Sequence, residues 1–274
     1  RHTRYWRDWS SDVCSSDLIV ISMKIPQSSK VAVIGAACNV SHTIENLVKV
    51  IERSFRDFLE IRFYIVEGNS SDDTKNILKK LENKGNFYSC SIEQNNIVIK
   101  YKTERIAAAR NHALEKIRNS NFNVDYLVVA DLDEINLGLT FESVMSNWEC
   151  RNWAGMFANQ PEGYYDIYAL KHEIWNTRDY ISDYDELIKY FNHNIALYLS
   201  MNSKRIKIPI SNPIIPVLSA FGGIAIYDYQ FVNSETSYRG LDENNNPICE
   251  HLSFNENIRK NGGSLFVNPK FTNT

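Results

Sequence analysis

The sequence has few cysteines, no long apolar run and little net charge, and each of these features argues against a class of protein. Its five cysteines form no C-x-x-C pair and no regular spacing, which disfavours a zinc site or a disulfide framework. No segment reaches the roughly 18 to 20 apolar residues of a membrane span. A net charge of −3, a pI near 6.1 and the lack of a long basic run give no basis for nucleic-acid binding.

Residues 1–18, RHTRYWRDWSSDVCSSDL, resemble a translated sequencing adapter. The segment from Cys14 to Leu18 is what TGCTCTTCCGATCT, the end of a common adapter, encodes in one frame. We therefore expect residues 1–18 to be artefactual and exclude them from the fold prediction. The natural start is then lost or lies just after this segment, at Met23.

The other 256 residues (274 minus 18) are enough for one large α/β domain, and their composition fits one. No linker rich in proline, glycine or serine divides the chain, so we expect a single domain over residues 19–274. Cysteines without pairing signals fit a reducing compartment. We therefore expect a cytoplasmic protein, with peripheral association at a membrane surface left open.

The first half alternates strand and helix signals. Strands are predicted at 30–37, 61–66, 96–101 and 125–130, and helices at 44–55, around 77–81 with Ser70 or Ser71 as N-cap, and at 104–118. This order predicts right-handed βαβ crossovers, a mostly parallel sheet, and a ligand site at the carboxyl ends of its strands. The second half is less regular, but residues 213–229 read as strand, turn, strand around a glycine pair.

A strand ending in three carboxylates is the first chemical signal. In VDYLVVADLDEIN the apolar run stops at Asp131, Asp133 and Glu134, and two aspartates spaced i, i+2 on extended backbone project from the same face. Magnesium and manganese take one or two carboxylates together with waters and substrate phosphates. An isolated D-x-D is more often a helix cap or a solvated loop, but its place at the mouth of a parallel strand favours a metal site.

Arg110 is the second signal. At 100° per residue it lies about 40° from Ile106 and Leu114 and about 20° from Ile117, within the apolar stripe of its helix. A buried arginine needs an anionic partner, which here is either a ligand diphosphate or the aspartates of DLDE. The alternative is an arginine at the edge of the stripe that reaches past the core into solvent.

The order of these features resembles the GT-A nucleotide-sugar glycosyltransferases, particularly family 2-like enzymes and capsule-associated mannosyltransferases. The likeness rests on the turn EGNSSDDT, the helix ERIAAARNHAL and the strand ending ADLDE, and it covers residues 30–136 well and 213–271 loosely. It implies a GT-A-like, Rossmann-like single domain in which residues 30–136 bind the nucleotide sugar and 137–274 the acceptor. It also implies a metal-dependent enzyme, a hexosyltransferase of polysaccharide biosynthesis, that moves a sugar from a UDP- or GDP-sugar to a glycan or lipid-linked acceptor.

The resemblance implies roles for particular residues. Asp133 would ligate Mn²⁺ or Mg²⁺ directly, and Asp131 would contact the metal through water or the donor ribose. The residues expected to border the donor are Ala37, Cys38, Asn39, Glu67, Asp72, Asp73, Arg105, Arg110 and Asp131, with Gly222 and Gly223 in a loop that closes over donor and acceptor. Without the resemblance, the glycine pair favours a simple bulge.

The late segment YRGLDENNNPICEHLSF supplies the remaining candidates. The resemblance implies that His251 is a third metal ligand and that Glu250 or Asp242 is the base that deprotonates the acceptor hydroxyl. Family 2 enzymes usually have a Glu-Asp pair near this point, and this chain has Glu-His instead. Glu250 and His251 would face opposite ways on extended backbone, so both can serve the site only if the segment turns.

Two other functions fit parts of the sequence. A sugar-phosphate nucleotidyltransferase could use the same sheet and acid pair, but the chain lacks the glycine-rich, lysine-bearing loop such enzymes usually have after the first strand. A non-catalytic carbohydrate-binding relic would keep the aromatic residues of 141–200, which either stack on sugars or fill the core. Such a relic has no need of Asp131, Asp133 and Arg110 together.

Overall fold

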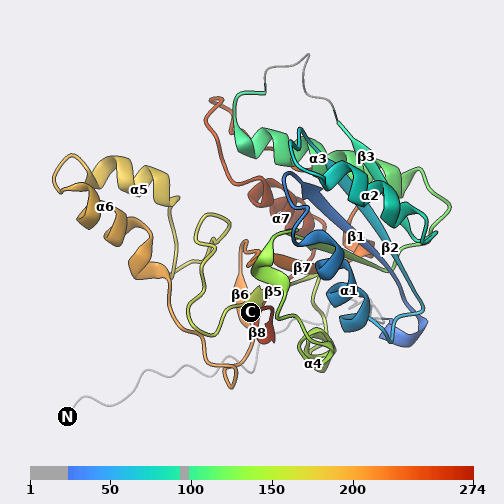
Figure 1. Ribbon diagram of the computed structural model, residues 1–274. Helices are drawn as coiled ribbons and strands as arrows, with labels where there is room; N and C mark the ends of the chain where they lie inside the picture. The colour runs from blue at the N-terminus through green and yellow to red at the C-terminus, as the bar shows by residue number, and fades with distance from the viewer. Residues whose placement is uncertain (1–23, 93–98) are drawn as a thin grey trace, which may run out of the picture.

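One eight-stranded sheet organises the protein, in the spatial order β3-β2-β1-β4-β7-β5-β8-β6. The computed structural model describes residues 24–92 and 99–274, so the adapter-like segment 1–18 lies outside the described residues. Four of the seven strand pairs are parallel and three are antiparallel. Helices flank the sheet (Figure 1), and the predicted single α/β domain with a mostly parallel sheet is confirmed.

The first half follows the predicted alternation. Its elements are η1 (Pro26–Ser28), β1 (Lys30–Ala37), α1 (Ile44–Ser54), β2 (Glu60–Glu67), α2 (Thr74–Glu82), β3 (Phe87–Ser91), α3 (Lys102–Arg118) and β4 (Tyr126–Ala130). Strands β3, β2, β1 and β4 run parallel to one another. The near-continuous apolar runs of β1 and β4 are buried on both faces, as expected for central parallel strands.

The third strand was predicted at the wrong place. It is Phe87–Ser91, whereas residues 99–101 contain no strand and residues 96–98 lie outside the described residues. The sequence FYSCS has only one fully buried residue because β3 is the edge strand, so its apolar signal is weak. The predicted cap of α2 was also wrong: the N-cap is Asp73, not Ser70 or Ser71.

The second half completes the sheet from the other side. Its elements are η3 (Glu134–Asn136), α4 (Phe141–Met145), η4 (Ser146–Glu149), β5 (Gly155–Asn159), α5 (Tyr180–Leu187), α6 (His193–Ser200), η5 (Asn202–Lys204), β6 (Ile215–Val217), β7 (Ile224–Asp228), η6 (Tyr229–Phe231), α7 (Glu250–Lys260) and β8 (Leu265–Thr272). The predicted strands within 213–229 are β6 and β7. They do not pair, because β7 lies between β4 and β5 while β6 forms the far edge against β8.

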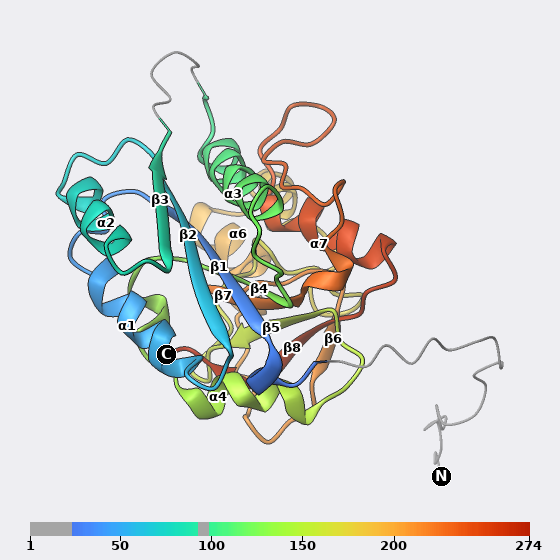
Figure 2. The same ribbon diagram turned by 90° about the vertical axis from the view of Figure 1, so that its right-hand side faces the viewer.

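The alternating side chains of the sheet create two cores, one on each face. One core joins Ile34 and Val129 to Leu114 of α3 and Phe254 of α7. The other core packs against α1, α2 and α4, and Figure 2 shows this layer with the sheet seen nearly along its edge. Helices α3 and α7 therefore share one face of the sheet, and this arrangement brings Arg110 of α3 next to Glu250 of α7.

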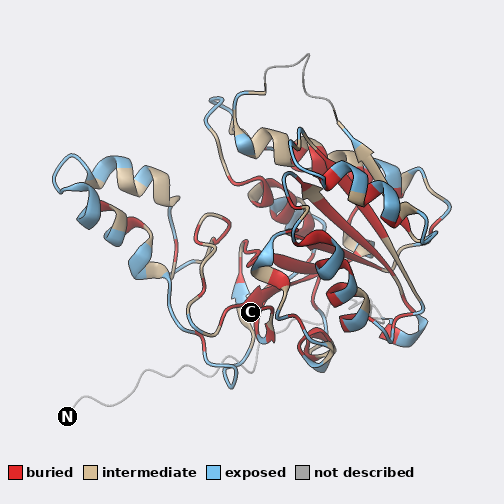
Figure 3. Cartoon of the chain, in the orientation of Figure 1, coloured by how far each residue is buried: buried red, intermediate tan, exposed pale blue. Residues whose placement is uncertain are grey.

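Helices α5 and α6 project from the body of the molecule as a hairpin (Figure 1). Figure 3 shows both helices partly in the exposed colour. Most of the exposed large apolar side chains of the described residues lie on this hairpin or on the segments that flank it: Ile174, Ile188, Tyr190, Phe191, Ile195, Tyr198, Leu199, Ile206 and Ile210. Other aromatics of the 141–200 run, such as Trp153 and Tyr164, are fully buried. Core packing therefore explains only part of that run.

None of the described helices is long and apolar enough to cross a membrane.

The glycine pair forms a tight turn just before β7. Gly222 has φ +70° and Gly223 has φ +87°, a region that residues with a Cβ rarely adopt. A Cβ on Gly222 would also lie 2.4 Å from the carbonyl oxygen of Ala158. The turn therefore needs glycine at position 222 for both conformation and space.

We predict that Gly222→Ala destabilises the protein more than Gly85→Ala does. Gly85 has φ +79° with nothing within 4 Å of the added Cβ, so both variants incur about 1–3 kcal/mol of backbone strain, and only Gly222→Ala adds the clash with Ala158. Urea unfolding of both variants measures the difference. Equal losses would contradict the close approach at Gly222.

Candidate active site

A cavity of about 700 Å³ opens at the carboxyl ends of β1, β2 and β4. Ala37, Glu67 and Asp131, which end or follow these strands, line it together with residues of α3, the loop after β5 and the start of α7. This is the position that the parallel topology predicts for a ligand. The cavity therefore contains most of the residues that the sequence singled out.

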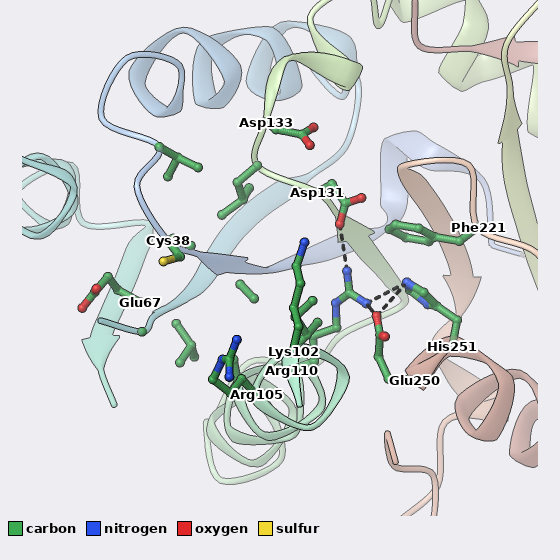
Figure 4. A pocket seen from close by; sticks show the side chains of 18 of the residues that line it. Cys38, Glu67, Lys102, Arg105, Arg110, Asp131, Asp133, Phe221, Glu250 and His251 are labelled. Carbon is green, nitrogen blue, oxygen red and sulfur yellow. Dashed lines mark hydrogen bonds and ion pairs between the residues drawn. The ribbon is translucent and has the colours of Figure 1, made fainter. Parts of the chain in front are cut away.

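Arg110 stands at the centre of the cavity wall and is only 2% exposed. Its Nη2 donates to Oδ1 of Asp131 at 2.9 Å, and its Nη1 pairs with Glu250 and lies 2.7 Å from Nε2 of His251. Figure 4 shows these three contacts converging on one guanidinium from the end of β4 and the start of α7. The prediction that Arg110 is buried with an anionic partner is confirmed, and the alternative of an arginine reaching into solvent is wrong.

The start of α7 explains how Glu250 and His251 serve the same site. Glu250 is the first residue of the helix, so the two side chains lie about 100° apart around its axis rather than on opposite faces. The His251 ring stacks on Phe221 with centroids 3.7 Å apart. Burial, and then the charge of Arg110, lower the pKa of His251 well below its usual value, so the ring is neutral and Nε2 accepts from Arg110.

The carboxylates of DLDE fit a metal that is shared with a phosphate ligand. Asp131 and Asp133 both line the cavity, and Asp133 is exposed and accepts a hydrogen bond from the Ile135 backbone at 3.2 Å. No cluster of three His, Cys, Asp or Glu residues that could hold a metal occurs in the described residues. The donor set therefore suits Mg²⁺ or Mn²⁺ that keeps waters and phosphate oxygens in its shell, not a cation enclosed by protein ligands.

His251 was predicted as a third metal ligand, and the structure does not bring it to the aspartate pair as one. Its Nε2 is occupied by Arg110, and its Nδ1 is buried without a hydrogen-bond partner among the described residues. Burial raises the pKa of Asp131 above the usual range, against the opposing charge of Arg110, and Asp133 adds to the rise. A bound divalent cation would favour the ionised carboxylate.

The side of the cavity at the ends of β1 and β2 contains some of the residues that were predicted to border the donor. Ala37, Cys38 and Glu67 line it, and so do Lys102 and Arg105 at the start of α3. Figure 4 shows Lys102 extending toward Asp131. The first turns of a 17-residue helix and two cationic side chains form a wall that favours an anion.

Three predicted donor contacts lie outside the cavity lining and support the loops instead. Oδ1 of Asn39 accepts from the Ser71 backbone at 2.8 Å, and Asp72 accepts from the Ser41 backbone at 3.0 Å. Asp73 is the N-cap residue of α2. Asn39 and Asp72 therefore join the loop after β1 to the loop after β2.

Gly222 and Gly223 support the site through their backbone carbonyls. The carbonyl of Gly223 accepts from the backbone N–H of Asp131 at 2.8 Å and from the side chain of Asn136 at 2.9 Å. The carbonyl of Gly222 accepts from the side chains of Gln160 and Asn273. The turn thus holds the backbone of Asp131 in place, and neither glycine lines the cavity.

Asp242 was a candidate base, and the structure places it away from the cavity lining. Its carboxylate closes a turn by accepting from the backbones of Asn244 at 2.9 Å and Asn246 at 2.7 Å. These bonds, the one from Asn246 first, lower the pKa of Asp242. Stabilising this turn is a structural role that accounts for an aspartate at position 242.

Sequence reasoning missed several residues of the cavity. Asp166 lines it from the loop after β5, between Tyr165 and Tyr168, which belong to the aromatic run expected either to stack on sugars or to fill the core. The only available signal was the acid and aromatic cluster in PEGYYDIYAL, and no strand had been predicted ahead of it. Phe221 and Cys249 were missed as well, because they are apolar neighbours of the glycine pair and of Glu250.

An acid pair that lines a cavity at the end of a parallel strand can hold Mg²⁺ together with the phosphates of a substrate. The family model for glycosyl transferase family 2 matches residues 32–206. This chain belongs to that family. No curated protein matches the chain.

The solved structures to which this chain is similar include the following three. S. aureus TarS 1-349 shares 14% identity over 87% of this chain and 57% of its own, with a TM-score of 0.49. The mannosyltransferase PcManGT from Pyrobaculum calidifontis, solved with GDP-Man and Mn²⁺, shares 13% over 89% of this chain and 56% of its own, with a TM-score of 0.49. Glucosyl-3-phosphoglycerate synthase from Mycobacterium tuberculosis shares 15% identity over 74% of this chain and 57% of its own, with a TM-score of 0.37. The chain thus spans less than two thirds of the length of each.

We predict that Arg110→Met lowers the free energy of unfolding by about 3–5 kcal/mol, because it leaves Glu250 buried without a partner. Adding Glu250→Gln removes the unpaired charge and should recover part of the loss. Urea unfolding measures both, with Arg151→Met, at an exposed arginine, as the control. A loss at Arg110 no larger than at Arg151 would contradict the buried pair.

We predict that His251→Gln changes how stability depends on pH. The pKa of His251 is lowered in the folded protein, so below about pH 6.5 the unfolded chain binds a proton that the folded chain does not, and stability falls as the pH falls. The variant lacks this slope, which is at most about 1.4 kcal/mol per pH unit. Unfolding free energies measured from pH 5 to 7 should therefore diverge between the two proteins, and parallel curves would contradict a buried neutral histidine.

Proposed function

We propose that this protein transfers a sugar from a nucleotide-diphosphate sugar to a glycan or lipid-linked acceptor, with Mn²⁺ or Mg²⁺ at the donor. The observation that carries the proposal is that the Asp131 and Asp133 pair and Arg110 share one cavity at the carboxyl ends of the parallel strands. Membership of glycosyl transferase family 2 supports it. The capsule-associated mannosyltransferases remain the subtype that the sequence resembles.

The donor would lie with its nucleotide toward the ends of β1 and β2. Ala37 and Cys38 offer backbone and small side chains there, and Glu67 offers a carboxylate to a ribose or base. Glu67 is kept in place by the Ser70 backbone at 2.5 Å and the Ser91 hydroxyl at 2.6 Å. The diphosphate would then lie between the start of α3 and the DLDE turn.

Asp131 and Asp133 would hold the metal, which supplies Lewis-acid stabilisation of the departing diphosphate when bound. Lys102 and Arg105 line the other side of the same space and would balance the remaining negative charge. Arg110 acts differently, because its guanidinium is already paired with two carboxylates. It orients Asp131 by a hydrogen bond of 2.9 Å and keeps that carboxylate facing the donor.

The acceptor would enter from the side of the loop after β5. Tyr165 and Tyr168 line this side of the cavity, and aromatic side chains combine a flat apolar face with a polar tip. Such a wall suits the C–H faces and hydroxyls of a sugar. Tyr168 also packs edge-to-face on Tyr180 at 5.4 Å, so this wall continues to the start of α5.

We predict that UDP or GDP stabilises the protein only when manganese is present. A ligand at a hundredfold excess over its dissociation constant stabilises by roughly 2.7 kcal/mol. Thermal-shift titrations with UDP, GDP and their sugars, each with and without manganese, measure the effect. Asp133→Ala should abolish the metal-dependent part because it removes a ligand at the cavity.

The matched control is Asp57→Ala, at an exposed aspartate between α1 and β2. It should respond to nucleotide and metal as the unmodified protein does. Stabilisation by GDP-mannose above all other donors would favour the mannosyltransferase subtype. A protein that responds to none of these nucleotides, with or without metal, would overturn the proposed function.

A further inference from the structure

Five acidic side chains line the cavity, and four of them already have a partner or a role. Glu67 accepts from Ser70 and Ser91, while Asp131 and Glu250 share Arg110. Asp133 is the exposed member of the proposed metal pair. Asp166 is the remaining acid of the cavity lining, and it has no role in the site described so far.

Asp166 is held by two backbone N–H donors, and no cation among the described residues pairs with it. Its Oδ2 accepts from the Gly222 backbone at 3.2 Å and its Oδ1 from the Ala169 backbone at 3.3 Å. In the described ranges 24–92 and 99–274, Asp166 forms no ion pair. Two neutral donors fix the direction of a carboxylate, and each oxygen keeps a lone pair that can accept a proton.

The loop that carries Asp166 is anchored on both sides of it. Tyr164 is fully buried, and its hydroxyl accepts from the Phe221 backbone at 3.2 Å. The side chain of Asn176 donates to the carbonyls of Ile167 and Leu170. This support holds Asp166 in one geometry, which a proton-transfer group requires.

The position of Asp166 matches the acceptor side of the cavity. It lies between Tyr165 and Tyr168, the two tyrosines of the proposed acceptor wall. The nucleotide side is formed by β1 and β2, which are separated from β5 by β4 and β7 in the sheet. Asp131, at the end of β4, therefore stands between the two sides.

We propose that Asp166 is the general base that deprotonates the acceptor hydroxyl, an inference that rests on the proposed function. The acceptor oxygen forms a bond to the anomeric carbon of the donor while the bond from that carbon to the diphosphate oxygen breaks. The hydroxyl proton moves to the Asp166 carboxylate, and the diphosphate leaves with the bonding electron pair. A single displacement of this kind inverts the anomeric configuration.

Glu250 is less suited to this role, although the sequence made it a candidate. It is ion-paired with Arg110, so moving a proton onto its carboxylate would take one of its two anionic partners from a buried guanidinium. Burial raises the pKa of Asp166 to about 6. That value is close to the pH at which a base both is ionised and accepts a proton effectively.

Consumption of the nucleotide sugar, with either water or azide as the acceptor, tests Asp166 without knowledge of the natural acceptor. Water must lose a proton during the attack, whereas azide has none to lose. Asp166→Asn should therefore lower kcat with water by about 10²–10⁴-fold, leave KM for the donor within about threefold, and restore most of the rate with azide. With Asp166 as the base, the rate of the unmodified protein with water rises with pH as the carboxyl group ionises. This rise should be absent in Asp166→Asn.

Two further variants separate chemistry from structure. Asp185→Asn, at an exposed aspartate of α5, should leave every rate unchanged. Asp166→Glu keeps the charge, so it should retain more activity with water than Asp166→Asn does. Stabilisation by UDP or GDP with manganese reports whether each variant keeps an intact donor site.

Three results would overturn the proposal for Asp166. Asp166→Asn could retain the rate with water within tenfold, lose the rate with azide to the same extent as with water, or lose nucleotide binding in parallel with activity. In each case the unmodified protein still binds nucleotide and consumes donor, so the proposed function would stand. An unmodified protein that consumes no donor with either acceptor, and binds no nucleotide, overturns the proposed function and the role of Asp166 with it.

Discussion

The buried charge of Arg110 is the constraint on which the cavity depends. A guanidinium that is 2% exposed is stable only where anions surround it, and here the anions come from the end of β4 and the start of α7. The ion pairs therefore tie α3, β4 and α7 together at the mouth of the cavity. Because both helices pack on the same face of the sheet, a single arginine can reach both acids, and the first turn of α7 brings His251 to it as well.

A second set of contacts fixes the backbone beneath these charges. The glycine turn before β7 accepts from Asp131, Asn136, Gln160 and Asn273, so residues from three distant segments converge on two carbonyls. Hydrogen-bond networks of this kind, buried in a low-dielectric interior, hold a geometry firmly. The backbone N–H of Gly222 also donates to the carboxylate of Asp166. One turn thus supports the acids on both sides of the cavity.

The fold of the first half could be predicted from the sequence because its signals are local. The apolar runs of β1 and β4 and the helical stripe of α3 need no distant partner to be recognised. The weak edge strand β3 was misplaced, since a strand that buries one residue leaves little pattern. In the site, Arg110 and the DLDE acids were identifiable because a charge in an apolar stripe, or an acid pair ending a strand, is unusual at the level of sequence alone.

By itself the sequence determined the βαβ alternation, the burial of Arg110 and the position of an acid pair at the end of a central strand. Only the tertiary structure decided how these parts share their charges: Arg110 pairs with Glu250 and contacts His251, and Asp242 closes a turn. It also brought Asp166 into the cavity from a loop that no local pattern marked. The physical reason is that spacing and polarity fix which side chains are buried, whereas the partners of a buried charge are set by packing between elements far apart in the chain.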